Sequence, residues 1–248
     1  MHILPKTTSP ANQPRIGIAS GANARAVLGT APVEADGSAY FEAPVGKAIF
    51  FQALDSDGMA VQSMRSATYV HPGEQLRCQG CHERKHTPPD LPRGIPLALQ
   101  RGPSAIRPEP EGANPFSYVR LVQPVLDRHC TDCHQKDKAV DLTGALEGPY
   151  GFTRSYNNLA KKYGFYYNSS NGSYRHATRG GARTEPGKFG ARGAKLTEYL
   201  GESHHGVRLT VEERRRVIVW LDANSDFFGA YEDTLAQSRG ELVKPTLD

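Results

Sequence analysis

The sequence predicts an α+β protein in which a small antiparallel β-sandwich is followed by a mainly α-helical domain with long loops. Two patterns in the 248 residues carry this prediction. Short β-branched and aromatic segments alternate with turn residues over residues 26–71, which is typical of hairpins. After residue 116, apolar residues recur at helical spacing behind helix-start signals.

Five segments of the N-terminal part are expected to be strands. They cover residues 26–33, 38–44, 48–55, 59–64 and 66–71. The sequences "EADG" and "DSDG" separate some of them, and Asp-Gly pairs favour the tight turns of hairpins. These segments together would form the two faces of the sandwich.

Residues 88–115 contain eight of the 18 prolines, which excludes a helix and indicates a linker or an extended covering segment. We therefore expect a domain boundary there. Residues 1–87 would form a β-rich domain, residues 88–115 a proline-rich linker, and residues 116–248 a helical domain.

Two helices of the C-terminal part have clear start signals. Pro124 stands where a first-turn proline is favoured, and Thr210 with Glu213 has the spacing of a capping box. The second helix then presents an apolar face that comprises Val217, Ile218 and Leu221. We expect Trp220, the single tryptophan, to pack in the core rather than against a cofactor.

All four cysteines belong to two Cys-x-x-Cys-His motifs, one just past the last expected strand and one in the helical domain. The motif residues are Cys78, Cys81, His82, Cys130, Cys133 and His134. Two thiols at this spacing can attach one porphyrin covalently, and the following histidine can bind its iron. The sequence therefore predicts two c-type haems, and the helical domain is expected to be cytochrome c-like.

Other uses of the cysteines fit the pattern less well. In a shared structural zinc site the two cysteine pairs are usually closer in the sequence than here, where residues 82–129 separate them. Zinc also does not require a histidine after each pair. A redox dithiol does not explain the duplication. Two structural disulfides are an alternative in a secreted chain, although a Cys-x-x-Cys loop is a poor bridge within itself.

The second haem needs a sixth ligand, and His204 and His205 are the candidates. Methionine is the usual competitor, but the three methionines all lie at or before residue 64. Two histidine ligands are therefore favoured, and they imply a lower potential than a histidine–methionine pair.

The first haem leaves more choices open. His86 follows His82 by four residues and so lies on the same side if that segment is helical. It could replace His82 as the proximal ligand, lie at the surface, or bind another species such as zinc together with His82. His71 and His176 remain as distal candidates, and an open sixth position would make this haem the reactive one.

Composition excludes several classes of protein. A net charge of +4 is too small to indicate nucleic-acid binding, and no apolar run is long enough to span a membrane. The first residues lack the apolar core of a signal peptide. Because c-type haems are attached outside the cytoplasm, we expect a periplasmic or other extracytoplasmic protein and a chain that is the C-terminal part of a longer precursor.

The segment from "VLGTAPVEADGSAYFEAP" to "LRCQGCHE" closely resembles the haem-bearing middle region of the hydrazine synthase alpha family. "LVQPVLDRHCTDCH" and "GESHHGVRLTVEERRRVIVWLDANSDFFGAY" are similar to the C-terminal dihaem region of the same planctomycete-type family. The resemblance implies an N-terminal β-propeller in the full-length protein. It also implies His204 rather than His205 as the distal ligand, because the family places a histidine and two variable residues before a triplet matched here by 207–209.

The resemblance also sets a limit. Hydrazine synthase itself has a tyrosine ligand four residues after the first motif's histidine, where this chain has His86, so hydrazine synthesis is not implied. The favoured function is a dihaem c-type cytochrome module that exchanges electrons with a redox partner protein. One alternative is a redox enzyme with the first haem as the catalytic centre for a small nitrogen or oxygen species, and another is a zinc-stabilised binding module.

Overall fold

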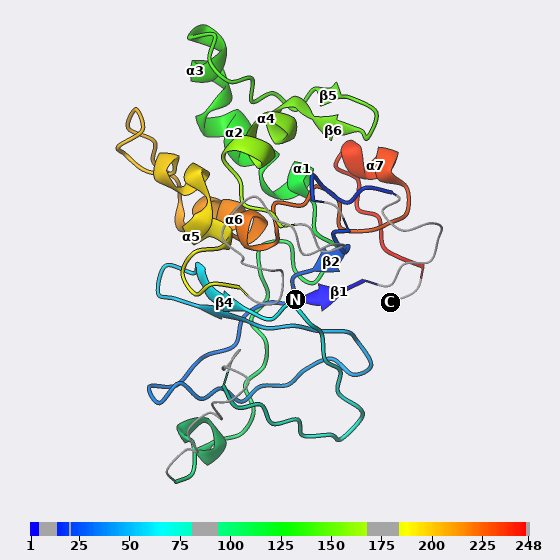
Figure 1. The fold of residues 1–248 in the computed structure, drawn as a ribbon, viewed down its shortest axis with the longest axis vertical. Helices are drawn as coiled ribbons and strands as arrows, with labels where there is room; N and C mark the ends of the chain where they lie inside the picture. Colours follow the sequence, from blue (N-terminus) through cyan, green and yellow to red (C-terminus); the bar gives the residue numbers. More distant parts are fainter. Residues whose placement is uncertain (5–13, 20, 81–93, 168–183, 247–248) are drawn as a thin grey trace.

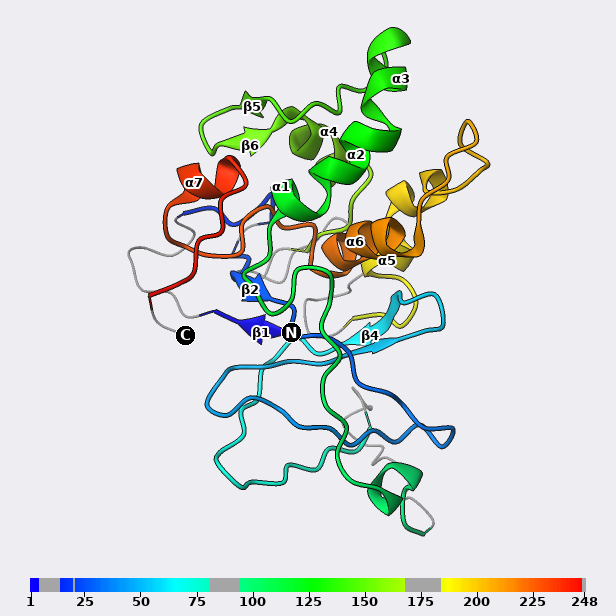
Figure 2. The same ribbon diagram turned by 180° about the vertical axis from the view of Figure 1, so that it is seen from behind.

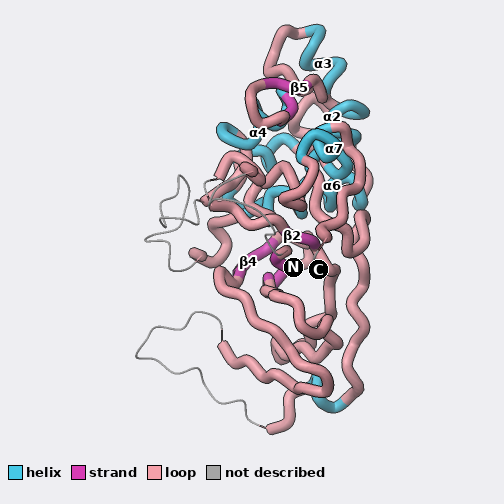
Figure 3. Tube along the Cα trace, turned by 90° about the vertical axis from the view of Figure 1, so that its right-hand side faces the viewer, coloured by secondary structure: helices cyan, strands magenta, loops and turns pink. Residues whose placement is uncertain are grey.

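The computed structural model describes residues 1–4, 14–19, 21–80, 94–167 and 184–246. The molecule is α+β, with short antiparallel ladders and short helices joined by long connections (Figures 1 and 3). The strands are β1 (His2–Ile3), β2 (Arg25–Ala26), β3 (Gln52–Leu54), β4 (Ala60–Ser63), β5 (Leu146–Glu147) and β6 (Phe152–Thr153).

The helices gather in the C-terminal part of the chain. The α-helices are α1 (Tyr118–Leu121), α2 (Gln123–His129), α3 (Thr131–Lys136), α4 (Arg154–Lys162), α5 (Gly190–Gly193), α6 (Val211–Asp222) and α7 (Thr234–Ser238). Within the described residues the 3-10 helices are η1 (Leu97–Gln100) and η3 (Lys195–Tyr199). Along the longest axis of the molecule, α3 lies at one end and the loop-rich N-terminal region at the other (Figures 1 and 2).

The ladders of the described residues are shorter than the strands that the sequence predicts. Three two-stranded antiparallel sheets form, β1–β2, β3–β4 and β5–β6, and the β3–β4 hairpin matches the expected pairing of residues 48–55 with 59–64. Elsewhere in residues 26–71 the extended chain forms isolated bridges, such as Thr30 with Arg107 and Phe41 with Ser104. A proline is adjacent to each of the two bridge residues Ser104 and Arg107. Because a proline has no backbone N–H to donate to a neighbouring strand, these pairings stay short.

The described part of the proline-rich segment covers the N-terminal residues. Thr30 and Arg107 exchange both backbone hydrogen bonds, and Ser104 N–H donates to the Tyr40 carbonyl at 3.0 Å. The sequence left two interpretations of this segment open, a linker or an extended covering segment. Where they pair with the N-terminal residues, residues 102–115 form an extended covering segment. The division of the chain into two domains remains a prediction.

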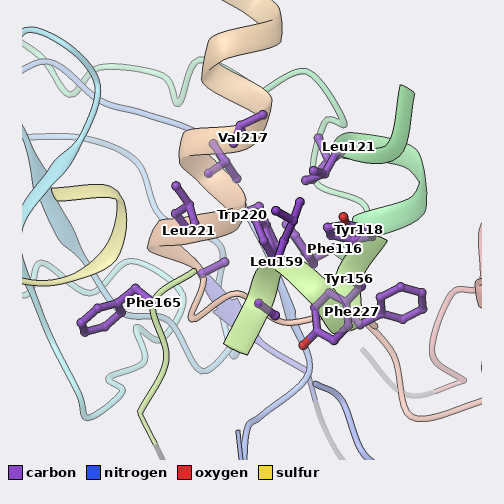
Figure 4. Close-up of a cluster of buried hydrophobic side chains, with 14 of the residues drawn as sticks. Phe116, Tyr118, Leu121, Tyr156, Leu159, Phe165, Val217, Trp220, Leu221 and Phe227 are labelled. Carbon is purple, nitrogen blue, oxygen red and sulfur yellow. The ribbon is translucent and has the colours of Figure 1, made fainter. Parts of the chain in front are cut away.

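The hydrophobic core is built mainly from α1, α2, α4 and α6 and from the aromatic chain after α6 (Figure 4). Trp220 is fully buried, and its Nε1 donates to the Asp226 carbonyl at 2.9 Å. The Tyr118 ring packs edge-on against it at 5.1 Å. The expectation that Trp220 packs in the core is confirmed.

The predicted start signals of both helices are also confirmed. Pro124 lies in the first turn of α2, and Thr210 caps α6 in a reciprocal capping box with Glu213. The expected apolar face of α6 is buried and consists of Val217, Ile218 and Leu221.

Buried polar groups join the N-terminal residues to this core. The Arg25 guanidinium forms a buried ion pair with Asp226 at 2.9 Å. The Asp222 carboxylate, at the end of α6, accepts hydrogen bonds from the backbone N–H of Ala60 at 3.0 Å and of Ala191 at 2.8 Å. One carboxylate thus joins β4, α5 and α6.

Candidate functional site

The second cysteine motif lies where α2 passes into α3. Cys130 is the residue between the two helices, and its backbone N–H donates to the Leu126 carbonyl at 2.9 Å. His134 N–H donates in turn to the Cys130 carbonyl at 3.1 Å, so Cys130 and His134 lie one helical turn apart. Both Cys130 and Cys133 are free thiols, the first half-buried and the second exposed. Burial, with the nearby Cys133, raises the pKa of the Cys130 thiol to about 11.

His134 is held in one orientation by the backbone that follows α3. Its Nδ1 lies 2.9 Å from the Val140 carbonyl oxygen. Because a carbonyl only accepts, Nδ1 carries the proton and donates to it. The lone pair is then on Nε2, which is the arrangement that metal-binding histidines commonly use.

His204 lies opposite His134 although 70 positions separate them in the sequence. The two imidazole ring centres are 6.2 Å apart, and the ring planes are inclined by 59°. His204 belongs to a turn that precedes α6, in which its N–H donates to the Gly201 carbonyl at 3.0 Å. This turn and α3 project from the same end of the molecule (Figures 1 and 2).

Neighbouring rings pack against His204 on its other sides. The Tyr199 ring lies edge-on at 5.1 Å and the His205 ring at 4.9 Å. Partial burial lowers the pKa of His204, and the nearby His205 and His134 lower it further. The neutral imidazole is therefore favoured at this position.

His205 differs from His204 in its backbone and in its exposure. It has a positive φ of 51°, and it is exposed whereas His204 is half-buried. The ring of His204 faces that of His134 across the site, and the ring of His205 packs against that of His204.

Glu213 connects the two segments that carry these histidines. Its Oε2 accepts from Thr210 N–H at 2.9 Å and lies 3.0 Å from the Thr210 hydroxyl. Its Oε1 accepts from Arg128 Nη1 at 2.6 Å and lies 3.0 Å from His129 Nε2. The donors, Thr210 N–H first and then His129, lower the pKa of Glu213 to about 2.

The first motif is only partly described. Cys78 is an exposed free thiol, and His71 is exposed as well. The other residues predicted for this site lie outside the described residues; they are Cys81, His82, His86 and His176. The predicted zinc near His82 and His86 therefore concerns residues that the structure does not describe.

The described residues do not bring the two motifs together. Residues 71–80 run through the half of the molecule that lies away from α3 in both ribbon views (Figures 1 and 2). Within the described ranges, no three or more His, Cys, Asp and Glu side chains are grouped so that they could hold a metal ion. In the same part of the chain, no helix combines the length and the apolarity that a membrane crossing requires.

Three contributors to the site were not anticipated from the sequence: the Val140 carbonyl, Tyr199 and His129. A backbone carbonyl has no sequence signal, and Tyr199 is recognisable only once η3 is placed beside the 201–206 turn. For His129 there was a signal, because it directly precedes Cys130.

Comparison with known proteins gives a consistent result. Residues 6–83 match the family model described as the hydrazine synthase alpha subunit middle domain. The hydrazine synthase subunit alpha of Kuenenia stuttgartiensis is 22% identical over 272 aligned residues, which cover 82% of this chain and 33% of that protein. The solved structure of Kuenenia stuttgartiensis hydrazine synthase matches with a TM-score of 0.55 and 21% identity, over 83% of this chain and 34% of that one. The chain thus spans about a third of the length of these relatives.

Proposed function

We propose that this chain, which is hydrazine-synthase-alpha-like, is a dihaem c-type cytochrome module that transfers electrons. When bound, each haem supplies a one-electron redox couple whose potential depends on its axial ligands and on its burial. The residues proposed to hold the two haems are Cys78, Cys81, His82, Cys130, Cys133, His134 and His204.

The observation that carries the proposal is the opposition of the His134 and His204 rings at 6.2 Å. Two iron–nitrogen bonds of about 2 Å each, with about 1 Å from each nitrogen to its ring centre, would separate two axial histidines by about 6 Å. The residues present therefore fit a haem held between these two rings and attached through Cys130 and Cys133.

Each residue of this site has a distinct role in the proposal. Cys130, one turn before His134, and Cys133, directly before it, would hold the porphyrin covalently. The Val140 carbonyl keeps the His134 proton on Nδ1 and so frees Nε2 as a ligand. His204, neutral because of its burial, would occupy the opposite face and keep water and small molecules from the iron. Two filled axial positions suit electron transfer rather than substrate binding.

The location and partners belong to the same proposal. An extracytoplasmic compartment follows from covalent haem attachment, which takes place outside the cytoplasm. Electrons would be exchanged with a redox partner protein, and a β-propeller would precede this region in the full-length protein.

A haem stoichiometry measurement tests the proposal. The chain is produced in a host with a c-type haem maturation system, and haem is quantified by the pyridine haemochrome spectrum after denaturation. We expect two covalent haems per chain, and one after Cys130 and Cys133 are both replaced by Ala. A wild-type chain with no covalent haem contradicts the proposal, and zinc in its place favours the binding module.

A further inference from the structure

We propose that Glu213 is a positioning residue that holds the His134 segment and the His204 segment at the separation the site requires. This inference rests on the proposed function, because it concerns the alignment of the two proposed axial ligands. It is carried by the contacts of a single, largely buried carboxylate whose side chain is 9% exposed.

The two oxygens of Glu213 contact different segments of the chain. Oε2 accepts from Thr210 N–H at 2.9 Å, at the point where the turn that carries His204 enters α6. Oε1 accepts from Arg128 Nη1 at 2.6 Å and is 3.0 Å from His129 Nε2, at the end of α2. His129 immediately precedes Cys130, and the helical turn from Cys130 ends at His134.

The linkage lies close to the opposed rings. One turn further along α6, Arg216 Nη1 donates to the carbonyl of Arg120, in α1, at 3.4 Å, which is a long contact. The Glu213 contacts are shorter and lie next to the motif. Small displacements there matter, because a ligand set must be held within about 0.5 Å of its working geometry.

The negative charge of Glu213 goes beyond what a helix cap requires. Glutamine serves equally well at the third position of a capping box, so the cap alone does not explain a carboxylate. Arg128 and His129 do explain it, because hydrogen bonds to an ionised carboxylate are about twice as strong as hydrogen bonds to a neutral acceptor. Arg128 is 69% exposed whereas His129 is 23% exposed, so His129 is the better-shielded partner.

Three substitutions separate positioning from simple helix stabilisation. Glu213→Gln removes the charge but retains the capping box. Thr210→Ala removes the cap but retains the contacts of Glu213 with Arg128 and His129. Glu212→Gln is the matched control, because Glu212 is the adjacent residue, is 65% exposed and pairs with Arg216 on its own helix.

The readout is carbon monoxide binding to the reduced haem protein. The signal of the variant with Cys130 and Cys133 both replaced by Ala is subtracted, which removes any contribution of the first haem, and the remainder is expressed as a fraction of the same remainder in His204→Ala. We expect Glu213→Gln to raise the carbon-monoxide-accessible fraction of the second haem about tenfold, because the charged hydrogen bonds are lost. Glu212→Gln should leave it unchanged.

Thermal unfolding of the same variants gives the second measurement. Thr210→Ala should lower the midpoint, because a helix N-cap is lost, with less opening of the haem than Glu213→Gln causes. His129→Gln, on the other side of the contact, should open the haem without disturbing the α6 cap, and it replaces Glu213→Gln if that variant does not fold.

The outcomes that would overturn the inference are specific. Equal carbon monoxide binding in Glu213→Gln and Glu212→Gln contradicts it, as does an opening in Thr210→Ala as large as that in Glu213→Gln. Either result, with a second haem that is low-spin and covalently bound in the wild type, leaves the proposed function standing. A wild type without that haem overturns the proposed function and this inference together.

Discussion

His204 and His205 are adjacent in the chain but differ in every property that matters for a ligand. His204 is half-buried and faces His134 at 6.2 Å, whereas His205 is exposed and has a positive φ of 51°. The pair is therefore a natural matched set, in which one substitution removes the proposed ligand and the other removes only its neighbour.

We predict that His204→Ala converts the second haem from a low-spin to a high-spin, ligand-accessible form without releasing it from Cys130 and Cys133. His205→Ala should leave the low-spin spectrum in place. Electron paramagnetic resonance of the oxidised protein checks both. Loss of the low-spin signal in His205→Ala alone would make His205 the ligand, and no change in either variant would remove the two-histidine assignment.

The residues of this site differ in how far the sequence predicts them. Cys130, Cys133 and His134 form a local motif with its own chemistry, and His204 was one of two candidates in one turn. The Val140 carbonyl and the contact of Glu213 with His129 depend on how α2, α3 and α6 pack. No spacing in the sequence encodes that packing.

At the scale of elements, the end of α6 depends on close approach between Asp222 and the start of α5. Gly190 has a φ of 56°, and a Cβ atom added to it would collide with Asp222 Oδ1. Gly187 in the same segment also has a positive φ, of 72°, but a Cβ atom there would meet nothing within 4 Å. A comparison of the two glycines therefore distinguishes the cost of backbone strain, which both share, from the cost of steric crowding, which only Gly190 has.

We predict that Gly190→Ala destabilises the protein more than Gly187→Ala. Both substitutions carry the cost of a left-handed conformation, about 1 kcal/mol. Gly190→Ala should cost about 1–3 kcal/mol more, because it displaces a carboxylate that accepts from the backbone N–H groups of Ala60 and Ala191. Urea unfolding of the two variants measures the difference, and equal losses would mean that the contact is relieved at no cost.

Secondary structure was predicted best where a local signal decides it. The Thr210 cap, the Pro124 turn and the β3–β4 hairpin follow from residues within a few positions of each other. The long strands expected for 26–33 and 38–44 reduce in the structure to isolated bridges with Ser104 and Arg107. These expected strands pair with a proline-rich segment far along the chain, which provides few backbone hydrogen bonds. The residues of the expected strands themselves carry no information about that partner.

At the scale of the whole molecule, residues 14–19 and 21–26 are built into the C-terminal core rather than apart from it. The Ile16 carbonyl accepts from the N–H groups of both Phe227 and Phe228 at 2.9 Å. The buried ion pair of Arg25 with Asp226 lies beside this contact. Such a pair costs more desolvation than an exposed one, so its charge state affects the stability of the entire fold.

The last prediction concerns the pH dependence of global stability. Burial raises the pKa of Asp226 to about 7 and that of Asp222 to about 6, both above the ordinary value of 3.8, although Arg25 opposes the shift at Asp226. A carboxyl group whose folded-state pKa is raised binds more protons in the folded protein than in the unfolded chain. The stabilisation that such a group adds to the free energy of unfolding is therefore fully present below about pH 4 and is lost as the pH rises through 6 and 7.

Glu213 acts in the opposite direction. Its pKa is lowered from 4.5 to about 2, so its contribution is present above about pH 4.5 and is lost as the pH falls towards 2. The two effects occupy separate pH ranges and can be measured independently.

Urea unfolding of the wild type and of Asp226→Asn between about pH 4 and pH 8 tests the sign. The wild type should lose free energy of unfolding as the pH rises, with a slope of at most about 1.4 kcal/mol per pH unit for each buried carboxyl group. Asp226→Asn leaves Arg25 unpaired and should be less stable near neutral pH, but its slope should be smaller because one titrating group is gone. Contributions that the two proteins share cancel, so the difference between the two slopes isolates Asp226. Identical slopes would mean that Arg25 keeps Asp226 ionised throughout this range.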